Sequence, residues 1–389
     1  MLREIAISGY LLFFNLFFFI FKIFPKRRKL CFVISFEENV VLIYRKLREI
    51  YPSLELVILH KTALSEEFKK EINASQSVPF ETHGLINWLK SIYHLATARW
   101  MIIDNYYGFL SAVTFRKNVE CIQIWHAAGA LKTFGLQDKT IRYRSPSANR
   151  RFQKVYDHFD KIVVGSEEMA GIFEEAFNVS SQRMLKTGIP RTDFFYDENL
   201  KQEAIQTFFK QYPKLSGKKR ILYAPTYRDG ELDHNQLHLD VKKMQRELGD
   251  DYLLLIKLHP AVRTTNQFDE LYPDFVYDFS NYGRVNELLL VADLLITDYS
   301  SLPVEYALLN KPMIFFSYDK DQYSEKRGLI NDYEEQVPGP IVYDTEHLIK
   351  VIIENNFNYK KIQDFSNRWN KYSNGNASEN LVKYLQQKG

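Results

Sequence analysis

The sequence predicts an α/β protein built from two sheets of parallel strands that are joined near residue 190. Short apolar runs of strand length alternate with stretches of helical spacing, which is typical of βαβ units. Most of these runs end in a polar cluster, as parallel strands do where an open sheet binds its ligand. At 389 residues, the chain also exceeds one typical domain. We therefore expect an N-terminal segment at residues 1–29, domains at residues 30–190 and 191–389, and a ligand in the cleft between the domains.

The first half of the chain contains apolar runs that we predict to be strands. They are separated by stretches such as residues 40–50 and 85–97, in which apolar side chains recur at helical spacing. The predicted strands are residues 30–35, 54–59, 99–103, 119–125 and 161–165. Ser166 follows the last of them as a good N-cap, with glutamates in the first turn of a helix that ends at Phe177.

The second half repeats the pattern, most clearly in residues 285–316. There a strand, a polar turn, a helical stretch at residues 303–309 and a second strand follow one another, with Pro303 just inside the helix start. Two polar helical stretches, residues 362–372 and 377–387, close the chain, and we assign them to the second domain. The predicted strands of this half are residues 220–224, 252–258, 275–278, 294–297 and 313–316.

The N-terminus predicts an association with a membrane. Residues 5–24 are almost wholly apolar, and Pro25 and a basic cluster at residues 26–29 follow at once. A spanning helix needs about 20 apolar residues, so this segment either crosses the bilayer once or lies in its interface, and a buried first helix is the soluble alternative. A secretory signal fits less well, because the basic residues lie on the wrong side of the apolar stretch. The basic cluster favours the cytoplasmic face of the cell membrane.

Composition and missing motifs exclude several function classes. A net charge of +3 is too small to argue for nucleic-acid binding, so we expect no nucleic-acid partner. Cys31 and Cys121 lie in predicted strands without metal-ligand spacing, which predicts neither a disulfide framework nor a zinc site. The chain has no GxGxxG, P-loop, HExxH or GxSxG motif. This argues against dinucleotide oxidoreductases, P-loop NTPases, zinc hydrolases and α/β-hydrolases.

Two of the polar strand ends carry a histidine, in the segments WHAAGALK and KLHP. His126 could act as a general base, because an unperturbed imidazole titrates near neutral pH. Gly129 would let the backbone approach a ligand closely, and Lys132 adds a positive charge. His259, with Lys257 on the same face of the strand, could donate to a phosphate oxygen and stabilise a leaving group. The competing interpretation is that each histidine is structural, as a lone histidine usually is.

The other two polar strand ends, APTYRD and TDYSS, offer groups suited to phosphate. Thr226 and Arg228 supply a hydroxyl and a guanidinium fork. The serines of TDYSS supply hydroxyls and backbone N–H groups at a helix N-terminus, and Glu305 could accept hydrogen bonds from ribose. The structural alternatives are a polar turn for Thr226 and Arg228, a helix cap for the serines, and a solvated acid on the helix for Glu305. The candidate binding residues are Gly129, Lys132, Thr226, Arg228, Lys257, Thr297, Asp298, Ser300, Ser301 and Glu305.

In the segments WHAAGALKTFG, ILYAPTYRD, KLHP and ITDYSSLPVEYALLNKP, the chain resembles the CDP-glycerol glycerophosphotransferases of teichoic acid synthesis in Gram-positive bacteria. The resemblance runs through residues 30–385. Polymerases of this family typically show HGTPLK where this chain has HAAGALK. The Ala-Ala-Gly-Ala version is similar to the TagB/TarB primases, and so is the hydrophobic N-terminus.

The resemblance implies a GT-B-like fold of two Rossmann-like domains, of which the second binds CDP-glycerol. It implies transfer of glycerol phosphate to the N-acetylmannosamine of an undecaprenyl-diphosphate-linked disaccharide, with release of CMP and no covalent intermediate. His126 would deprotonate the sugar hydroxyl, and Glu305 would bind ribose. His259 would stabilise the donor diphosphate with the help of Thr226, Arg228, Ser300 and Ser301. No metal or cofactor is implied. The implied partners are CDP-glycerol, the lipid-linked disaccharide, membrane lipids and other teichoic acid enzymes.

Two other kinds of function stay open. One is a related enzyme, namely a teichoic acid polymerase, a transferase that uses CDP-ribitol, or a GT-B glycosyltransferase that uses a nucleotide sugar. The other is a catalytically idle, membrane-bound scaffold that only binds a nucleotide. The presence of both His126 and His259 argues against the scaffold, because a decayed site would have no reason to retain both.

Overall fold

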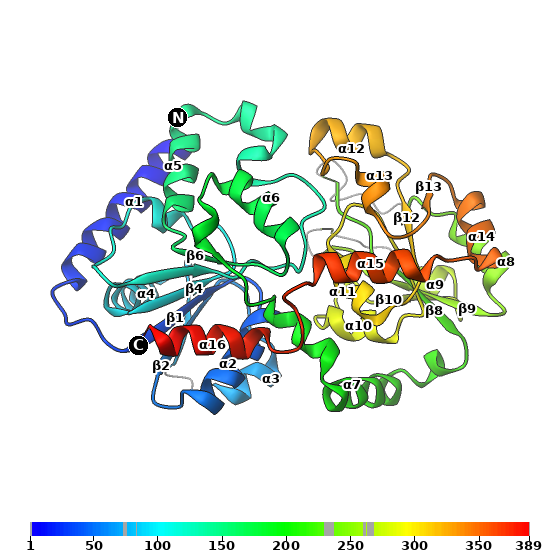
Figure 1. Ribbon diagram of the computed structural model, residues 1–389, viewed down its shortest axis with the longest axis horizontal. Helices are drawn as coiled ribbons and strands as arrows, with labels where there is room; N and C mark the ends of the chain where they lie inside the picture. Colours follow the sequence, from blue (N-terminus) through cyan, green and yellow to red (C-terminus); the bar gives the residue numbers. More distant parts are fainter. Residues whose placement is uncertain are drawn as a thin grey trace. The chain divides into compact units, whose positions relative to one another are not determined.

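The computed structural model of the protein describes residues 2–72, 76–82, 84–228, 237–259, 262 and 268–388, so Pro260 of KLHP lies outside the described residues. The chain forms two compact units, each built on one parallel sheet (Figure 1). Unit 1 comprises Met1–Ala127, Gly135–Asp193 and Tyr372–Gly389. Unit 2 comprises Ala128–Phe134 and Phe194–Lys371. The change of unit after Asp193 lies close to the boundary expected near residue 190.

The sheet of unit 1 has the strand order β3-β2-β1-β4-β5-β6-β7, and neighbouring strands run parallel. Every residue of β1 and β4 is buried, because helices cover both faces of the sheet (Figure 1). The carboxyl ends of all these strands lie at one edge. The strands are β1 (Lys29–Ile34), β2 (Glu55–His60), β3 (Ser77–Pro79), β4 (Trp100–Ile103), β5 (Glu120–Gln123), β6 (Lys161–Val163) and β7 (Met184–Leu185).

The helices of unit 1 come from both ends of the chain. The C-terminal helix α16 packs beside α2 (Figure 1), although we had assigned it to the second domain. Asp193 fixes its start, since its carboxylate accepts hydrogen bonds from the N–H groups of Ala377 (2.9 Å) and Ser378 (2.8 Å). The helices are α1 (Leu2–Phe21), α2 (Glu38–Ile50), α3 (Glu66–Glu71), α4 (Leu85–Thr97), α5 (Pro146–Asp157), α6 (Glu167–Phe177) and α16 (Ala377–Gln387), with a 3-10 turn η2 (Gly108–Ser111).

Helix α1 has the length and the composition of a membrane-crossing helix. The basic cluster that follows it differs in part from our expectation. Lys29 is fully buried as the first residue of β1, and its ammonium donates a hydrogen bond to the Thr97 hydroxyl at 2.7 Å. Lys29 therefore adds no surface charge to the basic cluster at residues 26–29.

Unit 2 contains a second parallel sheet, with the order β10-β9-β8-β11-β12-β13. Its strands are β8 (Lys219–Tyr223), β9 (Tyr252–Ile256), β10 (Val276–Asp278), β11 (Leu294–Thr297), β12 (Met313–Phe316) and β13 (Ile341–Val342). Its helices are α7 (Glu198–Gln211), α8 (Val241–Leu248), α9 (Phe268–Leu271), α10 (Val285–Val291), α11 (Leu302–Tyr306), α12 (Lys320–Lys326), α13 (Tyr333–Gln336), α14 (Thr345–Glu354) and α15 (Tyr359–Trp369). The predicted strands at residues 294–297 and 313–316 are confirmed as β11 and β12.

Candidate active site

The carboxyl ends of β1 and β4 meet where the strand order of unit 1 reverses, which is the usual ligand position in an open α/β sheet. Asp104 lies there, directly after β4, and is 1% exposed. Its carboxylate accepts hydrogen bonds from the N–H groups of Ser35 (2.8 Å) and Phe36 (2.7 Å) and from the Tyr107 hydroxyl (2.7 Å). Burial raises the pKa of this carboxyl from 3.8 to about 6, and the three donors oppose the rise. Asp104 therefore joins the ends of two strands.

His126 follows β5 at the same edge. Its Nδ1 lies 2.9 Å from the backbone oxygen of Asp104. Because a carbonyl oxygen only accepts hydrogen bonds, Nδ1 carries the proton and Nε2 is the basic nitrogen of the neutral ring. The ring stacks on Phe36 and on Trp125, with centroids 4.9 and 4.5 Å away. An imidazole held in this way is suited to take a proton from a hydroxyl group.

Buried polar groups that were not among the predicted site residues hold the backbone at His126. Asn39 donates from its amide to the backbone oxygen of Trp125 at 3.0 Å, and the Gln123 side chain accepts from the Trp125 N–H at 2.8 Å. Arg191 donates to the backbone oxygen of His126 at 3.1 Å. Trp125 has a φ of +55°, an unusual conformation for a bulky residue that persists only where the surroundings fix it.

Gly129 and Lys132 lie on the segment Ala128–Phe134, which belongs to unit 2 and begins two residues after His126. A Cβ atom at Gly129 would lie 2.4 Å from Cγ2 of Val304, so glycine lets the segment pack directly on α11. The backbone of Lys132 forms an antiparallel bridge with Leu329. We had expected Gly129 to allow the backbone to approach a ligand, whereas its close neighbour is a helix of the same unit.

At the corresponding reversal of strand order in unit 2, between β8 and β11, Asp298 accepts hydrogen bonds from the N–H groups of Thr226 (2.8 Å) and Tyr299 (2.6 Å). The Arg228 guanidinium lies 3.0 Å from Asp298 and pairs with both carboxylate oxygens of Asp319, at 2.7 and 2.8 Å. The Arg228 side chain is only 11% exposed. Its charge is thus balanced within the unit by two carboxylates at the strand ends.

Several side-chain hydroxyl groups lie at the carboxyl ends of β8 and β11. Thr226 is 9% exposed, and its Oγ1 has no hydrogen-bond partner among the described residues. The hydroxyl of Ser300 lies 2.8 Å from that of Thr297, which is fully buried and donates to the backbone oxygen of Ala224 at 2.7 Å. Ser301 lies at the N-cap of α11 without a side-chain capping bond, so the interpretation as a helix cap does not describe its hydroxyl. Thr297 orients its neighbour, whereas Thr226 and Ser301 are suited to contact a ligand.

The remaining predicted residues have different surroundings. His259 lies three residues after the end of β9, the neighbour of β8, and is exposed, with its ring 4.5 Å from that of Tyr227. The Lys257 ammonium donates to two backbone oxygens that follow β10, at 2.7 and 2.8 Å, so it supports that loop. Glu305 is 1% exposed within α11, which excludes the interpretation as a solvated helix acid.

The structure thus divides the predicted residues between the units. His126 belongs to unit 1, and all the others belong to unit 2. Within unit 2, Thr226, His259, Ser300 and Ser301 share the carboxyl edge of three neighbouring strands, β9, β8 and β11. One unit therefore carries an oriented base, and the other carries hydroxyls and an imidazole that suit the oxygens of a phosphate group.

Comparison with known proteins identifies the family. The family described as CDP-Glycerol:Poly(glycerophosphate) glycerophosphotransferase matches residues 16–387. The teichoic acid glycerol-phosphate primase of Bacillus subtilis (strain 168) is 39% identical over 389 residues, which cover 99% of this chain and 98% of that protein. The teichoic acid poly(ribitol-phosphate) polymerase of Bacillus spizizenii is 41% identical over 302 residues, which cover 77% of this chain and 48% of that protein.

Among solved structures, a variant of the wall teichoic acid polymerase TagF soaked with CDPG is 25% identical, with a TM-score of 0.78 and coverage of 100% of this chain and 98% of that chain. This likeness confirms the GT-B-like fold with two parallel sheets, and the sequence matches confirm the resemblance carried by the four motifs. The protein is an enzyme of teichoic acid synthesis that transfers a glycerol phosphate group. It belongs to the CDP-glycerol:poly(glycerophosphate) glycerophosphotransferase family.

Proposed function

We propose that this protein is a primase, which transfers one glycerol phosphate from CDP-glycerol to the N-acetylmannosamine of an undecaprenyl-diphosphate-linked disaccharide and releases CMP. The similarity to a glycerol-phosphate primase over nearly the full length of both chains supports the priming step. The likeness to a TagF variant soaked with CDPG supports CDP-glycerol as the donor. The polymerase relative is matched over only 48% of its length, so it gives less support for a polymerase reaction than the primase relative gives for priming.

The observation that carries this proposal is the hydrogen bond between His126 Nδ1 and the backbone oxygen of Asp104. It makes Nε2 the proton acceptor for the sugar hydroxyl. As the proton moves to Nε2, the hydroxyl oxygen attacks the β-phosphorus of CDP-glycerol. The new P–O bond forms while the bond from this phosphorus to the bridging oxygen breaks, so that CMP leaves with the bridging oxygen.

Unit 2 provides the donor site in this proposal. The hydroxyls of Thr226, Ser300 and Ser301 and the ring of His259 donate to the diphosphate and stabilise the charge that develops on CMP. Glu305 accepts hydrogen bonds from the ribose. The residues that act by positioning these groups are Gly129, Lys132, Arg228, Lys257, Thr297 and Asp298.

We further propose that α1 holds the enzyme at the cytoplasmic face of the cell membrane. The acceptor in this reaction is linked to a lipid and stays in the bilayer, so an enzyme with an apolar N-terminal helix works where its substrate is concentrated. Membrane lipids and other teichoic acid enzymes are the partners that this location implies.

The test is incubation of the full chain with labelled CDP-glycerol and a synthetic lipid-linked disaccharide, followed by measurement of product length. One added glycerol phosphate is the expected result. A ladder of products would make the protein a polymerase, and transfer only to an acceptor that is already primed would place it one step later. Transfer from CDP-ribitol alone would change the donor, and binding of CDP-glycerol without transfer to any acceptor would indicate an idle nucleotide-binding protein.

A further inference from the structure

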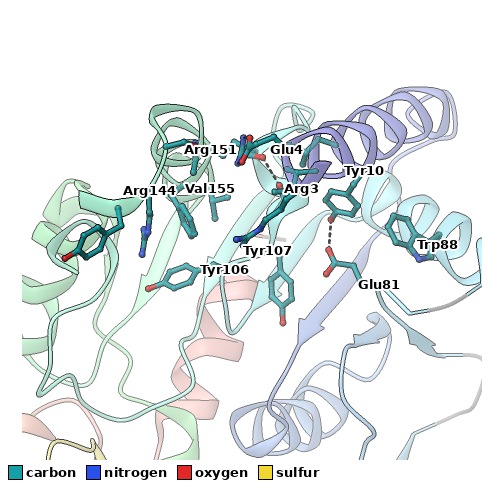
Figure 2. Close-up of a pocket in the computed structure, with 18 residues that line it drawn as sticks. Arg3, Glu4, Tyr10, Glu81, Trp88, Tyr106, Tyr107, Arg144, Arg151 and Val155 are labelled. Atoms are coloured by element: carbon teal, nitrogen blue, oxygen red, sulfur yellow. Dashed lines mark hydrogen bonds and ion pairs between the residues drawn. The ribbon is translucent and has the colours of Figure 1, made fainter. Parts of the chain in front are cut away.

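Unit 1 contains a cavity of about 830 Å³ beneath α1 (Figure 2). Its walls come from α1, α5 and η2, together with the residues that follow β4. Cavities of about 300–1,000 Å³ are typical of sites that enclose a ligand. None of the residues assigned above to the donor site lines this cavity.

The cavity borders the catalytic end of β4. Tyr107 lines it and donates through its hydroxyl to the carboxylate of Asp104 at 2.7 Å. The backbone oxygen of Asp104 accepts from His126 Nδ1. A ligand in the cavity would thus be separated from the proposed base by only Tyr107 and Asp104, within one unit.

The lining combines three arginines with aromatic surface, and its two carboxylates are both paired, Glu4 with Arg151 and Glu81 with Lys61. Figure 2 shows Arg3 extending from α1 toward Tyr107, with Arg144 and Tyr106 to one side of it and Tyr10 and Trp88 to the other. Arg3 makes no hydrogen bond or ion pair with any residue that the structure describes. Aromatic rings suit an isoprenoid chain, whereas guanidinium groups suit the charge of a diphosphate.

Two buried polar atoms at this cavity have no hydrogen-bond partner among the described residues, namely Nη1 of Arg144 and the hydroxyl oxygen of Tyr106. The nearest carboxylate, that of Asp138, lies 3.6 Å from the other terminal nitrogen of Arg144. Buried donors of this kind nearly always have an acceptor in a native structure. Both residues line the cavity, so an anion with several oxygens bound there would lie beside these two groups.

The roof of the cavity is suited to a lipid surface. Leu2, Ile5, Leu12, Leu16 and Phe19 are 54–82% exposed and recur at helical spacing along the outer face of α1. The inner face is bound to the unit along its length. Arg151 of α5 holds Glu4 at one end through two hydrogen bonds of 2.9 and 3.0 Å.

Other contacts bind α1 farther along. Phe14 stacks on Phe109 with centroids 5.0 Å apart, and Arg116 donates to the backbone oxygen of Phe24 just beyond the helix. A helix bound lengthwise in this way presents one apolar side to a bilayer plane, as interfacial helices do. The exposed cations Arg150 and Lys154 of α5 line a second hollow beside Leu12 and complement anionic headgroups. The cavity under α1 is therefore placed to receive a ligand from the lipid.

We infer that this cavity binds the diphosphate and the first isoprene units of a lipid-linked acceptor. This inference rests on the proposed function, because it names where the lipid part of the proposed acceptor lies. Arg3, Arg144 and Tyr106 donate to the diphosphate oxygens, and Tyr10 and Trp88 contact the isoprenoid. The sugar lies at the Tyr107 side of the cavity, the side nearest the hydrogen bond between Asp104 and His126.

The experiment is calorimetric titration of the full chain in detergent with farnesyl diphosphate as the probe. The expected result is binding that Arg144→Gln weakens at least tenfold, because a charge-assisted hydrogen bond to the diphosphate is lost. Tyr106→Phe, which removes only the hydroxyl, should weaken it severalfold. Arg142→Gln is the matched control, since Arg142 lies two residues away, is exposed and does not line the cavity. Farnesol and inorganic diphosphate, which each carry half of the probe, should bind more weakly than farnesyl diphosphate.

Ala148→Trp provides a second variant that does not depend on charge. Ala148 lines the cavity from α5, and an indole there would fill it and abolish probe binding. The melting transition of unit 1, measured by calorimetry in the same samples, shows that each variant is folded. Equal affinities of Arg144→Gln, Ala148→Trp and Arg142→Gln for the probe would overturn the inference, and so would tighter binding of phosphatidylglycerol than of the probe. This readout needs no transfer. If the variants lose probe binding while the wild type transfers glycerol phosphate to no acceptor, the result supports the cavity and refutes the proposed function.

Discussion

Replacement of Arg228 by glutamine should strongly destabilise unit 2. The guanidinium lies 3.0 Å from Asp298 and 2.7 Å from Asp319, with 11% of its side chain exposed. Glutamine would leave the buried carboxylate of Asp298 and the partly buried carboxylate of Asp319 without their cation, which costs about 3–5 kcal/mol for a buried pair broken in this way. For a body of this size, each kcal/mol lowers the melting temperature by about 2–4 °C. We therefore expect the transition of unit 2 to move down by roughly 6–20 °C.

Differential scanning calorimetry of the full chain measures this effect. Lys214→Gln is the control, because its ion pair with Asp274 is 3.7 Å long and lies at the surface, where such pairs contribute little. Adding Asp319→Asn to Arg228→Gln should recover part of the lost stability, since one uncompensated charge is removed. An unchanged melting temperature, together with a CDP-glycerol affinity weakened by two orders of magnitude, would refute this reasoning and make Arg228 a phosphate ligand.

Three further predictions concern packing, donor binding and pH. Gly129→Ala should push its segment away from Val304, reduce the free energy of unfolding by about 1–3 kcal/mol, and lower both the melting temperature and the transfer rate. Gly217→Ala is the control, because a Cβ there meets nothing within 4 Å. Equal behaviour of the two variants would contradict the close approach of Gly129 to Val304. Thr226→Val keeps the shape of the side chain but removes Oγ1, and it should weaken CDP-glycerol binding at least about tenfold in calorimetric titrations without changing the melting temperature. Burial raises the folded-state pKa of Asp104 from 3.8 to about 6, so between these pH values the folded protein binds more protons than the unfolded chain. The contribution of Asp104 to the free energy of unfolding therefore decreases by about 3 kcal/mol as the pH rises through 6. In urea titrations, the stability of the wild type relative to Asp104→Asn should accordingly decrease between pH 4 and 7, and a difference independent of pH would show that this pKa is not raised.

The strands and their polar ends could be predicted because their signals are local. An apolar run of four to six residues bounded by turn residues is legible in the sequence alone, and it located β11, β12 and the strand end at Asp298. His126 was found in the same way. Parallel strands place their carboxyl ends at one edge, so the pattern also predicted that the polar segments of one sheet would lie together.

The partners of these residues could not be predicted, because they are distant in the chain. Asp319 pairs with the guanidinium of Arg228 from 91 positions away, and nothing near Arg228 in the sequence indicates this partner. Gly129 meets Val304 only in the fold. Nothing local in the sequence indicates that the backbone oxygen of Asp104 orients His126. Similarly, the amphipathic pattern of α16 shows that one face is buried without indicating which sheet that face covers.

The most direct measurement of the proposed mechanism compares transfer from CDP-glycerol by the wild type and by His126→Gln. Glutamine retains polar atoms near those of the ring but cannot take a proton at neutral pH. Loss of a general base costs about 10²–10⁴-fold in rate, and CDP-glycerol affinity should stay unchanged, because the proposed donor residues all belong to unit 2. His347→Gln, at an exposed position of α14, should behave like the wild type. A transfer rate for His126→Gln within about threefold of the wild type would contradict the role of Nε2 as the base.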